Sequence, residues 1–323
     1  MKNNKLLPTI IAFISILLFY AVVQLLLSWG ILNRFQEVTL ITMGINVILA
    51  VSLNLIVGFT GQLNLGHAGF MAVGAYLSGV LTMKLGFPFL PALLLGAVGA
   101  AVTGLLLGIP TLRLKGDYLA IATLGFGEIV RNIIVNIEYL GGAAGLIGIP
   151  SHTNWSWVFL FTVFTVLVIR NFTASSFGRV CVAIREDELA TEAIGVDTTY
   201  IKVLAFTVGA FFAGAAGSLF AHYFYVIQPA TFSFMRSFDI LVMTVLGGLG
   251  SITGSVIAAV AITFLNTLLQ PLGPLRMVIY AALLIIIMIF RPQGLMGSKE
   301  FTYATLRRLV GVKNTGEQKD ELT

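Results

Sequence analysis

Long apolar segments recur along the whole chain, and they limit its possible folds more than any other feature. A helix needs about 20 apolar residues to cross the hydrocarbon core of a bilayer. Segments of about this length are 8–28, 38–58, 67–84, 88–109, 155–170, 201–226 and 275–290. Hydrophobic residues make up 58% of the chain and charged residues only 10%, so most of the surface must face lipid. The sequence therefore predicts an all-α polytopic membrane protein.

Two further regions decide the number of spans. Residues 118–138 are long enough but carry Glu128 and Arg131, and residues 236–268 are too long for one span and are broken by "GGLGSITG". Cytoplasmic loops are enriched in Lys and Arg, so the loops that carry most of these residues are assigned to the cytoplasmic side of the membrane. The cytoplasmic basic residues are then Lys2, Lys5, Arg113, Lys115, Arg170, Arg179, Arg185, Lys202, Arg291, Lys299, Arg307, Arg308, Lys313 and Lys319. The opposite side keeps only Arg34, Lys84, Arg236 and Arg276. With both termini cytoplasmic the number of spans is even, and we expect about ten, the eighth (about 236–248) being short.

The remaining composition argues for one membrane domain and little else. We expect a transmembrane domain over 1–297, with a retained first span, and a polar cytoplasmic tail over 298–323 that contains a short helix near 299–311. The net charge of +5 is explained by topogenic Lys and Arg and does not require nucleic acid. The single cysteine excludes an internal disulfide and a metal site built from cysteines.

Signatures of catalysis are missing from the sequence. No G-x-x-x-x-G-K-[ST] segment is present, so the chain does not itself cradle ATP phosphates. There is no H-E-x-x-H segment, and the three histidines, His67, His152 and His222, are not spaced like the ligands of a metal site. The sequence predicts a protein without bound cofactor or metal that is not an enzyme.

Two glycine-rich stretches are candidates for a transport route. In "GFTGQLNLGHAGFMAVGAY" (58–76), glycines interrupt the backbone between two spans, and Gln62, Asn64 and His67 add polar groups. Irregular backbone at membrane depth is tolerated only beside protein or a water-filled cavity. An ordinary cytoplasmic turn with small-residue helix packing is the alternative. "GGLGSITGSVIAAV" repeats the pattern, which is typical of broken helices beside a pathway. The candidate pathway residues are Asn46, Asn54, Gln62, Asn64, Glu128 and Arg131, and those of a gate-side break are Gly247, Gly248 and Gly250.

Glu128 and Arg131 lie three residues apart, so they share one face of a helix and can neutralise each other. Glu128 lies ten residues past Tyr118, about 15 Å along the helix axis, which is close to the midplane. An unpaired charge there costs at least about 2.5–3.5 kcal/mol, so we expect the pair to face the protein interior. The alternatives to a polar pathway lining are a structural ion pair and a helix displaced toward the interface.

The stretch "REDELATEAIGVD" (185–197) is strongly charged in a weakly charged chain. Its Glu, Leu and Ala residues favour a short helix that Gly195 can terminate. On a helical wheel, Leu189, Ala190, Ala193 and Ile194 form one stripe. Membrane-surface helices favour Lys and Arg on the polar face, so an acidic helix fits a protein partner better. A solvated loop is the alternative.

Four segments resemble one known family, the membrane permeases of bacterial branched-chain amino acid ABC importers, and within it the LivM-type subunit. They are "RLKGDYLAIATLGFGEIVRNII" (113–134), "GQLNLGHAGFMAVGAY" (61–76), "FDILVMTVLGGLGSITGSVIAA" (238–259) and "RPQGLMG" (291–297). The resemblance covers about residues 38–297. Where the family often has "GGPNGL", this chain reads "GGAAGLIGIP" (141–150), which leaves the amino acid carried open.

The resemblance implies a fold similar to the permeases of cobalamin-type importers and a place in the bacterial cytoplasmic (inner) membrane. It implies a LivH-type permease as heterodimer partner, two ATP-binding subunits that use ATP and Mg²⁺, and a periplasmic or lipid-anchored amino-acid-binding protein. Within a coupling loop of about 171–200, the residues that match the family's coupling helix are Glu188, Glu192, Ala193 and Gly195. The alternatives are a permease for urea, amides or another small solute, and a self-sufficient secondary transporter or channel; a membrane-embedded enzyme is a more distant one.

Overall fold

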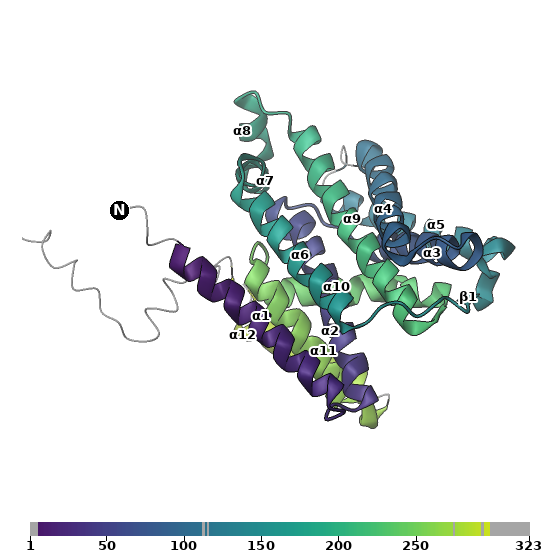
Figure 1. The fold of residues 1–323 in the computed structure, drawn as a ribbon. Helices are drawn as coiled ribbons and strands as arrows, with labels where there is room; N and C mark the ends of the chain where they lie inside the picture. Colours follow the sequence, from purple (N-terminus) through teal and green to yellow (C-terminus); the bar gives the residue numbers. More distant parts are fainter. Residues whose placement is uncertain (1–5, 112–113, 115, 274, 292–293, 298–323) are drawn as a thin grey trace, which may run out of the picture.

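The computed structural model describes residues 6–111, 114, 116–273, 275–291 and 294–297, and within them the chain is built almost entirely of helices (Figure 1). The predicted polar tail and its short helix lie outside the described residues. The α-helices are α1 (Leu6–Ser28), α2 (Arg34–Asn54), α3 (His67–Leu85), α4 (Phe89–Thr111), α5 (Asp117–Asn136), α6 (Trp155–Ala174), α7 (Ser176–Glu186), α8 (Glu188–Ala193), α9 (Thr198–Phe224), α10 (Phe234–Gly247), α11 (Ile252–Leu268) and α12 (Leu275–Phe290). The shorter elements are the π-helix η1 (Leu55–Phe59), the 3-10 helices η2 (Glu138–Leu140), η3 (Gly142–Ala144), η4 (Pro229–Phe232) and η5 (Gln270–Leu272), and the strands β1 (Leu146–Ile147) and β2 (Val226–Ile227).

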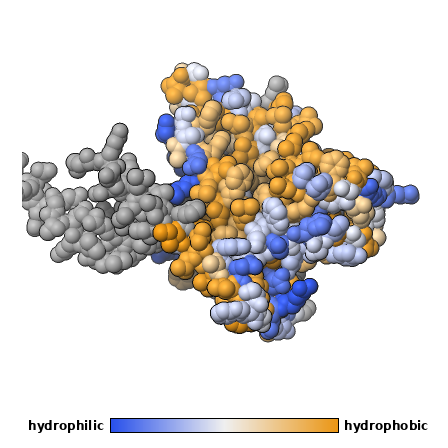
Figure 2. All heavy atoms as spheres, viewed as in Figure 1, coloured by the Kyte–Doolittle hydropathy of each residue, from blue (hydrophilic) through white to orange (hydrophobic). Residues whose placement is uncertain are grey.

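Six helices in the described part of the chain are long and apolar enough to cross a membrane. They are Arg34–Phe59, His67–Leu85, Phe89–Thr111, Asp117–Asn136, Trp155–Ala174 and Thr198–Phe224. Large apolar side chains such as Leu106, Ile121 and Leu160 are exposed on them, and Figure 2 shows a broad hydrophobic surface. The predicted all-α, multi-pass membrane protein is confirmed. The expected number of about ten spans is not confirmed, because six candidate spans are found in the described residues.

Small residues allow α3, α4 and α9 to pack closely on one side of the molecule (Figure 1). A Cβ atom built on Gly217 would lie 1.9 Å from the Met71 carbonyl oxygen, and one on Gly74 would lie 2.1 Å from the Gly214 carbonyl oxygen. Association of membrane helices depends on such close backbone approach, because lipid is as apolar as the side chains. Part of the glycine content therefore serves helix packing.

The chain doubles back after α2. This helix continues into the π-helical turn η1, and the segment 60–66 then returns along α2. The return is seen in the distance of 2.9 Å between the His67 Nε2 atom and the Ser52 hydroxyl. Ser52 precedes the end of η1 by seven residues, or about 10 Å of helix. Thr60, Gln62 and Asn64 in this returning segment are buried. The structure therefore has irregular backbone enclosed in protein and not an ordinary surface turn.

The predicted break in 236–268 is present. Helix α10 ends at Gly247, and Gly248 has a φ of +114° that favours glycine. Helix α11 begins at Ile252, where the Ser251 hydroxyl accepts a hydrogen bond from the Gly254 N–H at 3.1 Å. With 14 residues, α10 spans only about 21 Å, less than the roughly 30 Å of a bilayer core. The short eighth segment is confirmed as a helix, but not as a full-length span.

The structure contains a two-stranded antiparallel sheet that the sequence analysis did not predict. Leu146 pairs with Ile227 and Ile147 with Val226, which ties the loop after α5 to the end of α9. Strands of two residues carry no periodicity that could be read from sequence. They pair because Gly145 lets the backbones approach: a Cβ atom there would lie 2.0 Å from the Ile227 carbonyl oxygen.

Candidate functional site

The acidic stretch 185–197 contains a short helix, as predicted: α8 (Glu188–Ala193) lies within it. Arg185 and Glu186 are the last residues of α7, a helix that the sequence analysis missed, and α8 contains only six residues. Asp187 separates the two because its carboxylate accepts a hydrogen bond from the Ala190 N–H at 3.0 Å and so caps α8. Beyond α8, Gly195 has a φ of +88°, as expected for a residue that ends a helix.

The acidic side chains of α8 bind the protein itself, and its apolar side chains face outward. The Glu188 carboxylate forms an ion pair with Lys202, and the Thr198 hydroxyl donates a hydrogen bond to Glu192 at 2.6 Å. Leu189 is 68% exposed and Ile194 78% exposed. Two of the four predicted coupling residues, Glu188 and Glu192, thus hold α8 against α9. The other two, Ala193 and Gly195, lie on its exposed surface.

Arg185 connects the helix pair α7–α8 to the end of α2, a contact that the sequence analysis did not predict. Its Nη1 atom donates to the Gly58 carbonyl at 2.8 Å, and its Nη2 atom lies 2.6 Å from the Glu186 carboxylate. A Cβ atom on Gly61 would lie 3.1 Å from the Arg185 side chain, and one on Gly250 would lie 2.8 Å from its Nη1 atom. The guanidinium therefore lies where η1 and the glycine break meet.

Asn54 fixes the glycine break against η1. Its side-chain Nδ2 donates to the Ser251 carbonyl at 2.8 Å, and its Oδ1 accepts from the Gly250 N–H at 3.0 Å. Gly58 lies directly beside this clamp, since a Cβ atom there would be 1.8 Å from the Asn54 Oδ1 atom. A predicted pathway residue and a predicted gate residue are therefore direct partners. We call Asn54, Gly58, Arg185 and Gly250 the inner junction.

The other two glycines of the predicted break contact the segment after α12. The Met296 N–H donates to the Gly247 carbonyl at 3.2 Å. A Cβ atom on Gly248 would lie 2.4 Å from the Gly297 carbonyl oxygen, and one on Gly294 would lie 2.7 Å from the Gly248 backbone. The last four residues of the "RPQGLMG" motif, 294–297, thus pack against the break, and glycine is needed on both sides of this contact.

Three polar residues of the returning segment retain atoms without hydrogen-bond partners. Gln62 and Asn64 are 3% and 0% exposed, and His67 is 0% exposed. Both side-chain polar atoms of Gln62, the Nδ2 atom of Asn64 and the Nδ1 atom of His67 have no partner in the described protein. Buried polar atoms are normally paired, so these positions suit a polar ligand or water. His67 was recognised as a polar residue of this stretch, but it was not among the candidate pathway residues.

Asn46, in contrast, is fully engaged. Its Nδ2 atom donates to the Thr263 hydroxyl at 2.8 Å, and its Oδ1 accepts from Arg236 at 2.7 Å. Asn46 lies twelve residues, or about 18 Å, into α2 from Arg34. The charge count assigns Arg236 to the non-cytoplasmic side, at the start of the short eighth span, whereas this contact places its guanidinium beside the middle of α2.

Glu128 and Arg131 form the predicted ion pair, with 2.7 Å between the Arg131 Nη2 and Glu128 Oε2 atoms. Glu128 also accepts a hydrogen bond from the Phe234 N–H at 3.3 Å, which connects α5 to the start of α10. The two side chains are 31% and 32% exposed. The pair therefore lies at the edge of the helix packing of this chain, about two-thirds buried.

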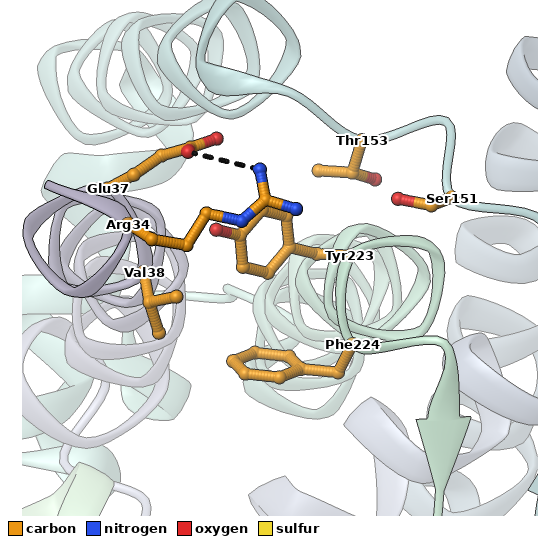
Figure 3. A pocket seen from close by; sticks show the side chains of 7 residues that line it. All are labelled: Arg34, Glu37, Val38, Ser151, Thr153, Tyr223 and Phe224. Atoms are coloured by element: carbon orange, nitrogen blue, oxygen red, sulfur yellow. Dashed lines mark ion pairs between the residues drawn. The ribbon is translucent and has the colours of Figure 1, made fainter. Parts of the chain in front are cut away.

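A pocket of about 270 Å³ lies at the start of α2, away from the inner junction (Figure 3). Its walls are Arg34, Glu37 and Val38 from α2, Ser151 and Thr153 from the segment before α6, and Tyr223 and Phe224 from the end of α9. Backbone hydrogen bonds hold the middle wall in place: Thr153 N–H donates to the His222 carbonyl at 3.3 Å, and Ile149 N–H donates to the Tyr225 carbonyl at 3.1 Å. The sequence analysis did not identify this pocket.

Comparisons with known proteins identify the family of the chain. Residues 37–288 match the family model described as branched-chain amino acid transport system / permease component. The chain is similar to the Salmonella typhimurium high-affinity branched-chain amino acid transport system permease protein LivM, with 36% identity over 85% of this chain and 73% of that protein. It is also similar to the corresponding LivH protein of Escherichia coli, with 26% identity over 78% of this chain and 91% of that one.

Among solved structures, the chain resembles PsaBC from Streptococcus pneumoniae in complex with Fab, with a TM-score of 0.47, 16% identity, and coverage of 82% of this chain and 95% of that one. The family model spans more than half of the chain, and the LivM relative exceeds 30% identity over most of both proteins. The resemblance read from four sequence segments is thereby confirmed. The chain belongs to the family of branched-chain amino acid transport permeases, and it is a membrane transport subunit and not an enzyme.

Proposed function

We propose that this permease is one half of an ATP-driven importer of branched-chain amino acids in the bacterial cytoplasmic membrane. In this proposal a LivH-type permease is its partner, two ATP-binding subunits hydrolyse ATP, and an extracytoplasmic binding protein delivers the amino acid. The chain crosses the membrane about ten times, both termini are cytoplasmic, and α8 is its coupling helix. The similarity to LivM and LivH proteins supports a permease pair.

The exposed apolar surface of α8 is the observation that carries the coupling assignment. Leu189 and Ile194 face away from the protein although they lie outside the six membrane-spanning candidates. The ion pair of Glu188 with Lys202 and the hydrogen bond of Glu192 with Thr198 prevent α8 from turning these residues inward. A short helix fixed in this way suits insertion into a groove of another protein, which is helix-in-groove recognition.

The contacts of Arg185 give a route from α8 to the transport path. Arg185 precedes Asp187, the cap of α8, by two residues, and its guanidinium binds Gly58. A displacement of the α7–α8 pair would therefore act directly on η1 and, through Asn54, on the break between α10 and α11. We assign Arg185 as a positioning residue for coupling. Gln62 and Asn64 are the preferred pathway residues, because their unpartnered atoms adjoin this junction in the chain.

Co-purification in mild detergent tests the proposal. The chain is co-expressed with a LivH-type permease, the ATP-binding subunits and the binding protein, and ATP hydrolysis and leucine uptake are measured in proteoliposomes. We expect a stable complex whose ATPase is stimulated by leucine-loaded binding protein. Uptake by this chain alone, or a complex that imports urea or an amide and not leucine, would contradict the proposal.

Ala193→Arg tests the docking surface itself. The exposed Ala193 becomes long and charged on a surface that would pack against the ATPase, so association should weaken by at least about tenfold, as for a disrupted interface centre. Ala143→Arg, at an exposed position in η3, is the matched control. Pull-down of the ATPase by membrane-inserted variants measures the effect. Equal ATPase recovery and stimulation with both variants would show that α8 is not the docking element.

A further inference from the structure

The pocket at the start of α2 combines both signs of charge with hydroxyl and apolar groups. Figure 3 shows Arg34 and Glu37 on one side, Ser151 and Thr153 opposite them, and Phe224 and Val38 along another wall. Its volume of about 270 Å³ is many times the roughly 10–15 Å³ of such space that one water molecule needs, so a molecule of about nine non-hydrogen atoms, such as leucine, has room. The pocket therefore has the size and the mixed chemistry of a small amphiphilic molecule.

The two charges are available to a ligand. The Arg34 Nη1 and Glu37 Oε2 atoms are 3.8 Å apart, which is longer than a hydrogen bond, and the Arg34 side chain is 91% exposed. Exposed ion pairs of this kind contribute little to the free energy of folding. Replacing this contact by contacts with a ligand therefore costs the protein little stability. Glu37 also lies in the first turn of α2, where the helix dipole favours a carboxylate in its charged form.

Thr153 provides an independent sign of a ligand. It is only 5% exposed, it lines the pocket, and its hydroxyl has no hydrogen-bond partner in the described protein. Its backbone N–H donates to the His222 carbonyl at the end of α9, and its hydroxyl points toward Ser151 in Figure 3. Rotation about the Cα–Cβ bond would turn the hydroxyl toward a ligand beside Arg34 without breaking the backbone contact. A buried hydroxyl without a partner is unfavourable, and a polar group bound in the pocket would relieve this.

The position of the pocket fits a site on the delivery side of the membrane. Tyr223 and Phe224 end α9, whereas α8 precedes the start of the same helix. The 27 residues of α9 separate the two by about 40 Å, which exceeds the thickness of a bilayer core. If α8 meets the ATPase in the cytoplasm, this pocket opens at the opposite side.

We propose that this pocket is an outer binding site for a zwitterionic amino acid with an apolar side chain. The carboxylate binds the Arg34 guanidinium and the Thr153 hydroxyl, and the ammonium group binds the Glu37 carboxylate. The aliphatic side chain packs on Val38 and Phe224. The assignment of branched-chain substrates rests on the proposed function, but the requirement for both a carboxylate and an ammonium group follows from the pocket.

Equilibrium binding of labelled leucine to the purified importer in nanodiscs tests this site. We expect Arg34→Gln and Glu37→Gln each to weaken binding about tenfold, the effect of losing one charge-assisted hydrogen bond. Thr153→Val should weaken binding a few-fold without lowering the melting temperature of the complex, because its hydroxyl has no protein partner in the described residues. Arg179→Gln and Glu138→Gln, at exposed positions outside the pocket, are the matched controls.

Two leucine analogues separate recognition from a structural effect. 4-Methylpentanoate lacks the ammonium group and 3-methylbutylamine lacks the carboxylate, so both should bind the unmodified protein more weakly than leucine. Glu37→Gln should remove the preference for leucine over 4-methylpentanoate, and Arg34→Gln the preference over the amine. Arg34→Lys, which keeps the charge, should restore most of the binding.

The outcomes distinguish the pocket from the proposed function. If the unmodified complex imports leucine while both charge variants bind and import it equally well, the pocket assignment is wrong and the proposed function stands. If the complex does not import leucine but leucine binds with the predicted analogue pattern, the proposed function fails and the pocket stands. A loss of binding that accompanies a lowered melting temperature, without a change in analogue preference, would also overturn the pocket assignment.

Discussion

The inner junction and the pocket at the start of α2, proposed above as an outer binding site and called the outer pocket below, lie near opposite ends of α2 and are built in opposite ways. At the inner junction, Asn54 uses both ends of its amide, and Arg185 binds a backbone carbonyl. In the pocket, the two charges are 3.8 Å apart, and the Thr153 hydroxyl has no hydrogen-bond partner among the described residues. Paired polar groups transmit displacement because they cannot move separately, whereas unpaired groups are free to bind a ligand.

The largest effect is expected for Gly58→Ala. A Cβ atom at this position would lie 1.8 Å from the Asn54 Oδ1 atom and 2.4 Å from the Gly250 nitrogen. We expect the junction to be forced apart, with a destabilisation of about 1–3 kcal/mol for overpacking and loss of transport. Gly125→Ala, where a Cβ atom meets nothing within 4 Å, should behave like the unmodified protein. Thermal unfolding by fluorescence-detected size exclusion measures both; an unchanged Gly58→Ala variant would show that the junction is not tightly packed.

The second prediction concerns Cys181 on α7, outside the membrane-spanning candidates. Burial raises the pKa of this thiol from 9.0 to about 11, so its thiolate fraction at pH 8 should be about a hundredfold lower than for an ordinary cysteine. N-ethylmaleimide should therefore label Cys181 slowly, and faster as the pH rises toward 11. Stability from the neutral thiol is present below about pH 9 and lost as the pH rises through the folded pKa.

Ser151→Cys supplies the comparison for this labelling experiment. Ser151 is exposed and lines the outer pocket, so its cysteine variant should react rapidly at pH 8 on a Cys181→Ser background. Mass spectrometry of the labelled protein gives the two rates. Similar rates for the two thiols would remove the contrast between a closed inner region and an open outer one.

Arg185→Gln should separate ATP hydrolysis from transport. The variant loses the charge-assisted hydrogen bond to Gly58, so the leucine imported per ATP hydrolysed should fall about tenfold while complex assembly is retained. Arg179→Gln is the control, because Arg179 is exposed on the same helix. Its guanidinium donates a local hydrogen bond, to the Ala174 carbonyl at 3.3 Å. Parallel losses of ATPase activity, assembly and transport would indicate a structural role for Arg185 and not a coupling role.

The smallest effect is expected for Glu128→Gln. The ion pair with Arg131 is about one-third exposed, and pairs of this kind contribute about 0.2–1 kcal/mol. Glutamine can still accept the hydrogen bond from the Phe234 N–H. Leucine uptake should therefore change no more than about threefold. A complete loss of uptake would assign this pair to the pathway and would move the functional centre away from the inner junction.

Features with local signals were predictable. The apolar segments match the helices, the glycines at 247–250 end α10, and the spacing of Glu128 and Arg131 gives an ion pair. The family followed from four motifs, and the family model confirms it. In each case the physical cause acts over a few consecutive residues: apolar length, helix periodicity, or the backbone freedom of glycine.

Features that depend on distant contacts were not predictable. Arg185 and Gly58 are 127 residues apart, β1 and β2 belong to separate loops, and the pocket uses three segments. The sequence also could not show that Glu188 and Glu192 bind α9 while Leu189 and Ile194 stay exposed. The sequence by itself determined a helical membrane permease, because apolar length and glycine breaks are local properties. Only the tertiary structure decided which polar groups are paired and which are free, because pairing depends on segments that approach each other only after folding.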